Sequence, residues 1–309
     1  MYYPYLRGRQ YELLALRELA SEGLISNNII PVVEPIKLTS TFDGCMKAFV
    51  DKKSLIALIF NPVVGELTDV PSVFDQLHSR FLNSNYMIVP TLLLNHNAET
   101  VMNLITSNGT DFGVVAAALN SRDSLDIYET VFPQYAPRFT LCPDDRLIRR
   151  KVYRGKILFE DRFNKKDRNA DYNDPDDEFF SDDHLYFKDD NYNGFGDFTI
   201  VGDDYIEAGF APYAVAIHIV YFDTERILRI HHFVSDSNDD TSDVAGKYYE
   251  AVSKLARWYH AGQPCQLTKA LSIFLDHADT GYYPGLPTVK KLSIMHHFEL
   301  MSNFLDGGI

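Results

Sequence analysis

The feature that constrains the fold most is a series of short apolar runs, rich in β-branched residues, that recur along the chain up to residue 201. Runs of this kind are typical of parallel strands that are covered on both faces. The segments between most of them are long enough for one helix, and strand, helix, strand at this spacing indicates right-handed βαβ units. The runs that we interpret as strands are 4–10, 29–37, 55–60, 86–94, 112–119, 138–141, 156–158 and 198–201.

Eight strands with intervening helices predict an α/β fold of the (β/α)8, TIM-barrel-like class. The alternative is an open doubly wound sheet, which a glycine-rich loop after the first strand would favour. Residues 6–9 contain one glycine and no GxGxxG motif, so we predict a barrel over residues 1–210. Within it, segment 164–193 has ten acidic residues against four basic ones and predicts an acidic loop in place of a helix.

The remaining residues, 211–309, are predicted to form a β-hairpin and a helical extension packed on the barrel. Two apolar runs, 213–222 and 227–233, flank a polar turn and indicate the hairpin. Three helices are expected after it, at about 243–261, 265–278 and 287–305.

Charge and composition exclude several classes of protein. A net charge of −14 over 309 residues argues against a face that binds duplex DNA, although it leaves room for a local basic pocket. The N-terminus does not resemble a signal peptide, and no apolar run is long enough to span a membrane, so we expect a cytoplasmic protein without membrane contact. Cys45, Cys142 and Cys265 are too far apart to indicate a disulfide framework or a metal knuckle.

Charged and polar side chains follow several predicted strands at their carboxyl ends, which is where α/β barrels place their active sites. The predicted catalytic residues are carboxylates, Glu34, Glu160 and Asp161, which would act as general acid and base. The residues predicted to bind an anionic substrate are Arg7, Arg9, Lys37, Asn61 and Arg162.

Two alternatives remain open for these residues. The three carboxylates could instead bind Mg²⁺ or Mn²⁺, because hard oxygen ligands suit these ions. The basic residues could instead form structural ion pairs with the same carboxylates around the barrel rim. His218 lies in the middle of an apolar strand and is predicted to be a core histidine. The pairs His231-His232 and His296-His297 lack the spacing of a zinc site.

Two blocks near the N-terminus resemble the phage Beta protein family. They are Pro4-Tyr5-Leu6-Arg7-Gly8-Arg9-Gln10-Tyr11-Glu12, and Ile30-Pro31-Val32-Val33-Glu34-Pro35. Later blocks, at 196–202, 214–222 and 290–297, resemble a closer, uncharacterised bacterial family that is known by a locus-tag name. The resemblance implies a barrel-like protein carried by phages and mobile elements, and it transfers no catalytic residues.

These observations predict an enzyme that acts on a small anionic substrate, such as a nucleotide or another phosphate ester. The reaction would be a hydrolysis, with divalent-metal dependence as an option. The alternative is a non-catalytic module that binds a protein partner encoded nearby, in a phage-defence or mobile-element complex. Its contact surface would begin at Tyr213, and the acidic loop would mimic nucleic acid for a basic partner.

Overall fold

The computed structural model describes residues 1–82, 86–206 and 211–308. The chain divides into two compact units. The first, which we call the barrel unit, consists of Met1–Asp161 and Asp183–Phe198. The second, which we call the hairpin–helix unit, consists of Arg162–Asp182 and Thr199–Ile309.

The barrel unit contains an eight-stranded parallel sheet in which each strand pairs with the next one along the sequence of the unit. The strands are β1 (Tyr5–Leu6), β2 (Val32–Val33), β3 (Ile56–Ile59), β4 (Ile88–Leu93), β5 (Ala116–Ala118), β6 (Thr140–Cys142), β7 (Lys156–Phe159) and β9 (Gly194–Gly196). The two edges meet, because the backbone N–H groups of Tyr3 and Tyr5 donate to the carbonyls of Phe195 (2.9 Å) and Asp197 (2.8 Å). The predicted barrel is therefore confirmed.

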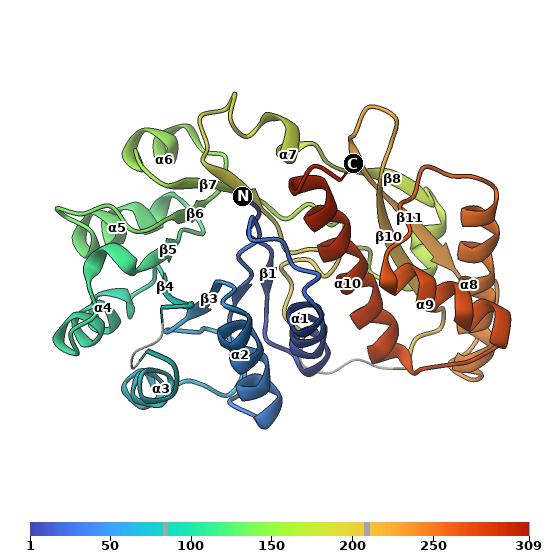
Figure 1. The fold of residues 1–309 in the computed structure, drawn as a ribbon, viewed down its shortest axis with the longest axis horizontal. Helices are drawn as coiled ribbons and strands as arrows, with labels where there is room; N and C mark the ends of the chain where they lie inside the picture. Colours follow the sequence, from blue (N-terminus) through green and yellow to red (C-terminus); the bar gives the residue numbers. More distant parts are fainter. Residues whose placement is uncertain (83–85, 207–210, 309) are drawn as a thin grey trace. The chain divides into compact units, whose positions relative to one another are not determined.

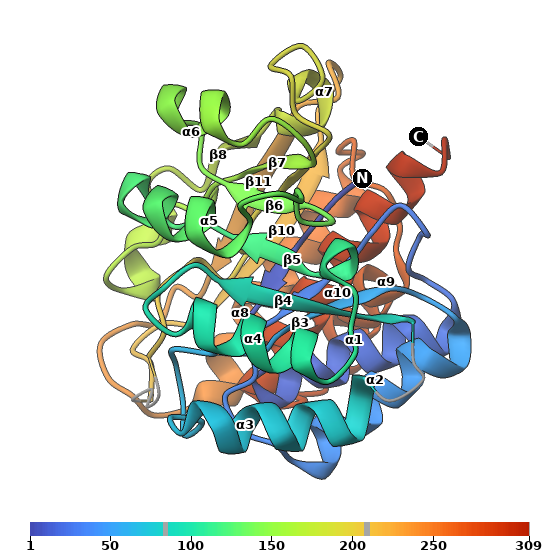
Figure 2. The same ribbon diagram turned by 90° about the vertical axis from the view of Figure 1, so that its left-hand side faces the viewer.

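Helices cover the outside of this sheet, as Figure 1 and Figure 2 show for α2 to α6. They are α1 (Gln10–Glu22), α2 (Ser40–Lys52), α3 (Val70–Leu77), α4 (Ala98–Ser107), α5 (Leu125–Val131), α6 (Arg146–Lys151) and α7 (Asp183–Tyr186). Helix α1 illustrates why they form: Leu13, Leu16 and Leu19 are buried at helical spacing, and Gly23 ends the helix in the left-handed conformation, with φ 73°.

The inside of the barrel is filled by side chains from alternate strand positions. Examples are Val32 on β2, Ala57 and Ile59 on β3, and Ala116 and Ala118 on β5. Alternation follows from the two-residue period of a strand, which sends successive side chains to opposite faces. Both faces of the sheet are buried, and this explains why the strands appear in the sequence as nearly continuous apolar runs.

The eighth strand differs from the prediction. It is β9, whereas residues 199–201 of the predicted strand 198–201 form a turn. The physical reason is the closure of the barrel. A Cβ atom at Gly194 would lie 2.7 Å from the carbonyl oxygen of Met1, and one at Gly196 would lie 2.3 Å from that of Tyr3. Only glycine fits against the first strand here, so this strand lacks the β-branched residues that marked the others.

This close approach gives a prediction for Gly196→Ala. The added methyl group would overlap the Tyr3 carbonyl oxygen, and relieving the overlap requires the closing strands to separate. We expect the barrel unit to lose about 3 kcal/mol of unfolding free energy. Amide hydrogen exchange of β1 and β9 would measure the loss. Gly44→Ala, in helix α2 where Cβ would contact only the Arg17 side chain at 3.5 Å, is the matched control and should be neutral or stabilising. Unchanged exchange in Gly196→Ala would contradict the steric explanation.

The hairpin–helix unit contains a three-stranded antiparallel sheet in the order β10–β11–β8. Strands β10 (Ala216–Phe222) and β11 (Leu228–Val234) form the predicted hairpin. The third strand, β8 (Asp177–Ser181), comes from the acidic segment 164–193, which was predicted as a loop. That segment also holds the 3-10 turn Asn169–Asn173 and helix α7. Its acids at 177 and 178 are paired across the sheet, as described below, and this pairing allows a strand there.

The three predicted C-terminal helices are present as α8 (Val244–His260), α9 (Lys269–Thr280) and α10 (Leu286–Leu305). Helix α8 packs on β11, α10 packs on β10, and α9 contacts both helices (Figure 1). None of the helices in the described part of the chain combines the length and the apolar character that a membrane span requires.

Candidate functional site

Glu34, a predicted catalytic residue at the end of β2, is fully buried. Its Oε2 accepts hydrogen bonds from the Tyr5 hydroxyl, at 2.8 Å, and from the Arg7 guanidinium. Its Oε1 accepts from the backbone N–H of Val63 at 2.7 Å. Burial and the Glu34 carboxylate raise the pKa of Tyr5 well above its usual value of 10.0, which keeps the phenol protonated as a donor. Both oxygens of the Glu34 carboxylate therefore accept hydrogen bonds from groups of the barrel unit itself.

Aromatic rings enclose the Arg7 side of this cluster. The Arg7 guanidinium carbon lies 5.2 Å from the centre of the Tyr5 ring and 5.4 Å from that of Phe198. Phe159 packs against Phe198 with ring centres 4.9 Å apart. Cations over ring faces at this distance are attracted by the ring quadrupole. The geometry favours the structural ion-pair hypothesis for Arg7 and Glu34 over an open anion site.

Asn61 and Lys37 also have partners within the barrel unit. Asn61 is buried, accepts from the Leu93 N–H at 2.9 Å and donates to the Leu93 carbonyl at 2.7 Å, which fixes the end of β3 to β4. Lys37 pairs with Glu66 at 3.0 Å on the surface, where both side chains are more than half exposed. Exposed pairs of this kind contribute little to stability.

The other predicted site residues lie at two further places. Glu160, just after β7, accepts from the Asp144 N–H at 2.8 Å through Oε1. Arg9 is the residue before α1, and its N–H donates to Glu12 at 3.3 Å. Asp161 ends the first stretch of the barrel unit and Arg162 begins the hairpin–helix unit.

A metal site was the alternative for Glu34, Glu160 and Asp161. Among the described residues there is no group of three or more His, Cys, Asp and Glu side chains arranged to hold a metal ion. The cysteines are buried and unpaired, and burial raises the pKa of Cys142 to about 12, so its thiol stays protonated.

A chain of titratable side chains crosses the sheet of the hairpin–helix unit. His218 on β10 lies opposite His232 on β11, and their Nδ1 atoms are 2.8 Å apart. His232 Nε2 lies 3.3 Å from Oε1 of Glu178 on β8. We call Glu178, His232 and His218 the relay chain. The neighbours Asp177 and His231 lie on the opposite face, where His231 stacks on Trp258 and Asp177 accepts from Arg229.

The hydrogen bonds of the relay chain determine the tautomers. An ionised Glu178 can only accept, so His232 Nε2 carries a proton and donates it. A neutral His232 then has a lone pair on Nδ1, which accepts from the Nδ1–H of His218. His218 Nε2 is consequently the unprotonated nitrogen. Within the described residues, His218 makes no hydrogen bond other than the one to His232.

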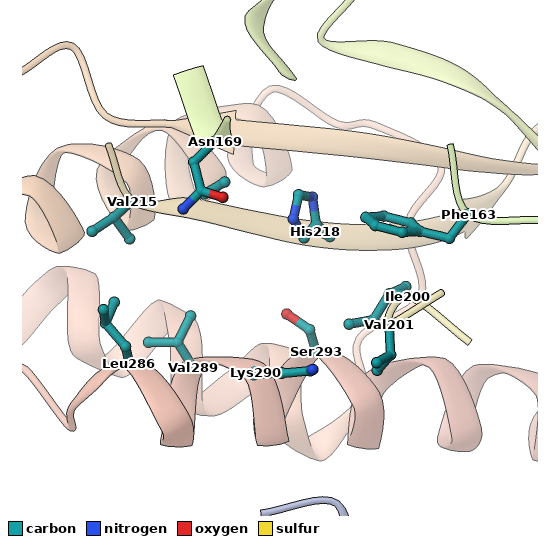
Figure 3. A pocket seen from close by; sticks show the side chains of 11 residues that line it. Phe163, Asn169, Ile200, Val201, Val215, His218, Leu286, Val289, Lys290 and Ser293 are labelled. Atoms are coloured by element: carbon teal, nitrogen blue, oxygen red, sulfur yellow. The ribbon is translucent and has the colours of Figure 1, made fainter. Parts of the chain in front are cut away.

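Two cavities share Phe163, Asn169 and His218 in their walls, and we call them the His218 cavities. The smaller has a volume of about 240 Å³ and is closed on its other side by helix α10. Figure 3 shows Ser293 of that helix pointing toward the strand that carries His218, and Lys290 lines the same cavity. The larger has a volume of about 950 Å³.

The wall of the larger cavity contains more basic than acidic side chains. Lys165, Lys166 and Arg168 line it, against one acid, Asp167. Lys165 pairs with Asp204 at 2.9 Å and Arg168 with Asp171 at 3.2 Å, whereas Lys166 has no ion pair among the described residues.

The protonation state of His218 follows from its surroundings. Burial, then the neighbouring His232 and Lys290, hold the pKa of His218 well below its usual value of 6.5. Burial also lowers the pKa of His232, and Glu178 opposes that shift. Both rings are therefore neutral at pH 7, and His218, which lines both cavities, has one unprotonated ring nitrogen.

From its place in an apolar strand, His218 was predicted to be a core histidine, without a connection to His232 or Glu178. The hairpin pattern could have shown that His218 faces His232. If the hairpin turns at 223–227, then 218 and 232 lie at equal distances from the turn and must face each other. Glu178 had no comparable signal, because its strand was not predicted. No family model, no curated protein and no solved structure matches the chain.

Proposed function

We propose that this protein is a hydrolase that acts on a small, anionic, phosphate-bearing substrate in the His218 cavities. The observation that carries the proposal is a three-member proton relay that ends in the wall of a cavity lined by three cations. A general base held by a second group, beside an anion-binding surface, is one arrangement that can hydrolyse a phosphate ester. The general base is thus His218 rather than Glu34, Glu160 or Asp161.

The proposed reaction begins with a water molecule beside His218. Nε2 of His218 takes a proton from this water while the resulting hydroxide attacks phosphorus. The Nδ1 proton of His218 passes to Nδ1 of His232, and the Nε2 proton of His232 passes to Glu178. After these transfers both histidines are neutral again, and Glu178 carries the proton as a carboxylic acid. The bond from phosphorus to the leaving oxygen breaks, and that oxygen takes a proton from solvent. The reverse transfers then return the extra proton of the relay to solvent at Nε2 of His218, which restores the base.

The cations would position the substrate. Lys166 is the principal candidate, because its ammonium has no ion pair within the described ranges and it lines the larger cavity. Lysine and arginine bind phosphate oxygens by charge-assisted hydrogen bonds. A role in a phage-defence or mobile-element system is proposed only on the resemblance to the Beta protein family.

The test is hydrolysis of bis(p-nitrophenyl) phosphate and p-nitrophenyl phosphate by the purified full-length protein. We expect His218→Asn to lower kcat/KM by about 100-fold, the usual scale for a general base. The wild-type rate should stay constant as the pH falls to 6.5, because the pKa of His218 lies well below that value. Assays with EDTA and with added Mn²⁺ would decide whether a divalent metal takes part.

His231→Asn is the matched control, since His231 is the next residue on the same strand and faces away from the cavities. Full activity in His218→Asn, or release of nitrophenolate by the wild-type protein no faster than in buffer, would contradict the proposal. Absence of turnover together with a stoichiometric protein partner would favour the binding module instead.

A further inference from the structure

The densest basic stretch of this acidic protein lies in the barrel unit and belongs to neither site discussed above. Six basic residues occur between positions 146 and 156, on helix α6 and at the start of β7. They are Arg146, Arg149, Arg150, Lys151, Arg154 and Lys156. Four of them line a cleft of about 720 Å³, which we call the basic cleft, together with Tyr153 and residues 190–193.

Some of these cations have structural partners. Arg149 pairs with Asp144 at 3.1 Å, and Lys151 pairs with Glu129 outside the cleft. Lys156 donates to the Arg149 carbonyl at 3.3 Å and lies 5.8 Å from the centre of the Tyr192 ring. The Tyr192 hydroxyl donates to Asp144 at 3.0 Å, so the floor of the cleft is ordered by its own contacts.

Arg146 and Arg150 have no such explanation. Both are exposed, and neither forms an ion pair with any residue that the structure describes. They are four residues apart on α6, where like charges repel. Arg146 is also the first residue of the helix, and the helix dipole disfavours a cation at that end. The dipole favours Arg150, which lies in the last turn, but neither arginine gains an ion pair on folding, and this points to a bound anion as the group that they contact.

Tyr153 adds an aromatic surface to this cleft. Its side chain is 69% exposed, although large aromatic side chains are usually buried or half-buried. An exposed ring beside arginines can stack on a nucleobase while guanidinium groups bind the phosphates in a bidentate manner. The cleft volume falls in the range of small-molecule sites, about 300–1,000 Å³.

We propose that the basic cleft binds the phosphates of a nucleotide, either free or within a single strand of nucleic acid. Arg146 and Arg150 hold the phosphates, Lys156 contributes charge from the floor, and Tyr153 stacks on the base. The acidic remainder of the protein repels long polyanions, so the contact is confined to this cleft. The inference does not depend on the hydrolase proposed above, which uses residues of the other unit.

The test measures binding of fluorescein-labelled oligothymidylate to the full-length protein by fluorescence anisotropy, at about 50 and about 200 mM salt. The variant Arg146→Glu/Arg150→Glu should bind at least about tenfold more weakly, and the slope of log affinity against log salt should fall by about 2. Tyr153→Ala should weaken binding of the oligonucleotide but leave competition by inorganic pyrophosphate unchanged.

Lys52→Glu/Lys53→Glu is the matched control, because both lysines are exposed in the same unit and the change in charge is identical. Competition by ADP as strong as that by the unlabelled oligonucleotide would identify a free nucleotide as the ligand, and affinity that rises with oligonucleotide length would identify a single strand. The proposal is overturned if the arginine variant binds like the wild type, or if the lysine control weakens binding equally.

Discussion

Replacing Glu34 by alanine is expected to lower the unfolding free energy of the barrel unit by about 4 kcal/mol, which is the scale for removing one partner of a buried ion pair. The change removes the acceptor of three donors at once, the Tyr5 hydroxyl, the Arg7 guanidinium and the Val63 N–H. Each of these lies at the end of β1 or in the chain after β3. Hydrogen exchange of the barrel strands in urea would measure the loss.

The control for this change is Glu66→Ala, which removes the exposed pair with Lys37 and should cost well under 1 kcal/mol. A double variant, Arg7→Met/Glu34→Leu, tests why Glu34→Ala loses stability. If the cost arises from breaking a buried pair, replacing both partners by apolar side chains should recover much of the stability. A Glu34→Ala protein as stable as the wild type but inactive towards phosphate esters would refute the structural role and support the catalytic role predicted from the sequence.

The sequence predicts the barrel well because its signal is local. A strand buried on both faces must be apolar at nearly every position, so β3 and β4 can be recognised without knowledge of their neighbours. Strand β9 could not be recognised, because its glycines are required by the close approach of a backbone segment that is distant in the sequence. Strand β8 was not recognised because it contains Asp177 and Glu178, whose side chains meet their partners Arg229 and His232 only after the sheet has formed.

In the candidate sites too, the sequence predicts what depends on local residues and misses what depends on distant ones. For the charged residues at strand ends, an ion pair between Arg7 and Glu34 was one of two alternatives, and the structure contains that pair. The sequence could not show that Tyr5 and Val63 also donate hydrogen bonds to the same carboxylate. The relay chain needs the register of three strands, one of which was not predicted. Arg146 and Arg150 can be recognised as a candidate anion site only when two facts are known. These are where the helix begins, and that neither arginine has an ion pair in the described residues.

Acid is expected to unfold the hairpin–helix unit, because helix α10 buries two neutral histidines. His296 donates from Nε2 to the Val220 carbonyl at 2.8 Å, and its Nδ1 accepts from the Thr268 hydroxyl at 2.7 Å. Burial lowers the pKa of His296 from 6.5 to about 4, and burial together with His296 lowers that of His297 to about 3. His297 is fully buried and packs edge-on against Phe180, with ring centres 5.4 Å apart.

The direction in which stability changes with pH follows from proton uptake on unfolding. Both pKa values are lower in the folded state, so below pH 6.5 the unfolded chain binds more protons than the folded one. Stability from these residues is complete above pH 6.5, falls as the pH decreases below it, and is exhausted near pH 4 for His296 and near pH 3 for His297. With both groups acting, the loss at pH 5 is on the order of 4 kcal/mol.

Urea unfolding followed by the fluorescence of Trp258, the one tryptophan of the sequence, reports on the unit that contains both histidines. His297→Met places an apolar side chain at this site and removes one titrating group, so the mean slope of stability against pH between 6.5 and 5 should fall by about 1 kcal/mol per pH unit. His96→Asn, at an exposed position, should leave the slope unchanged. An unaltered slope in His297→Met would show that the acid sensitivity comes from other groups, because a histidine that is neutral only when folded must contribute to it.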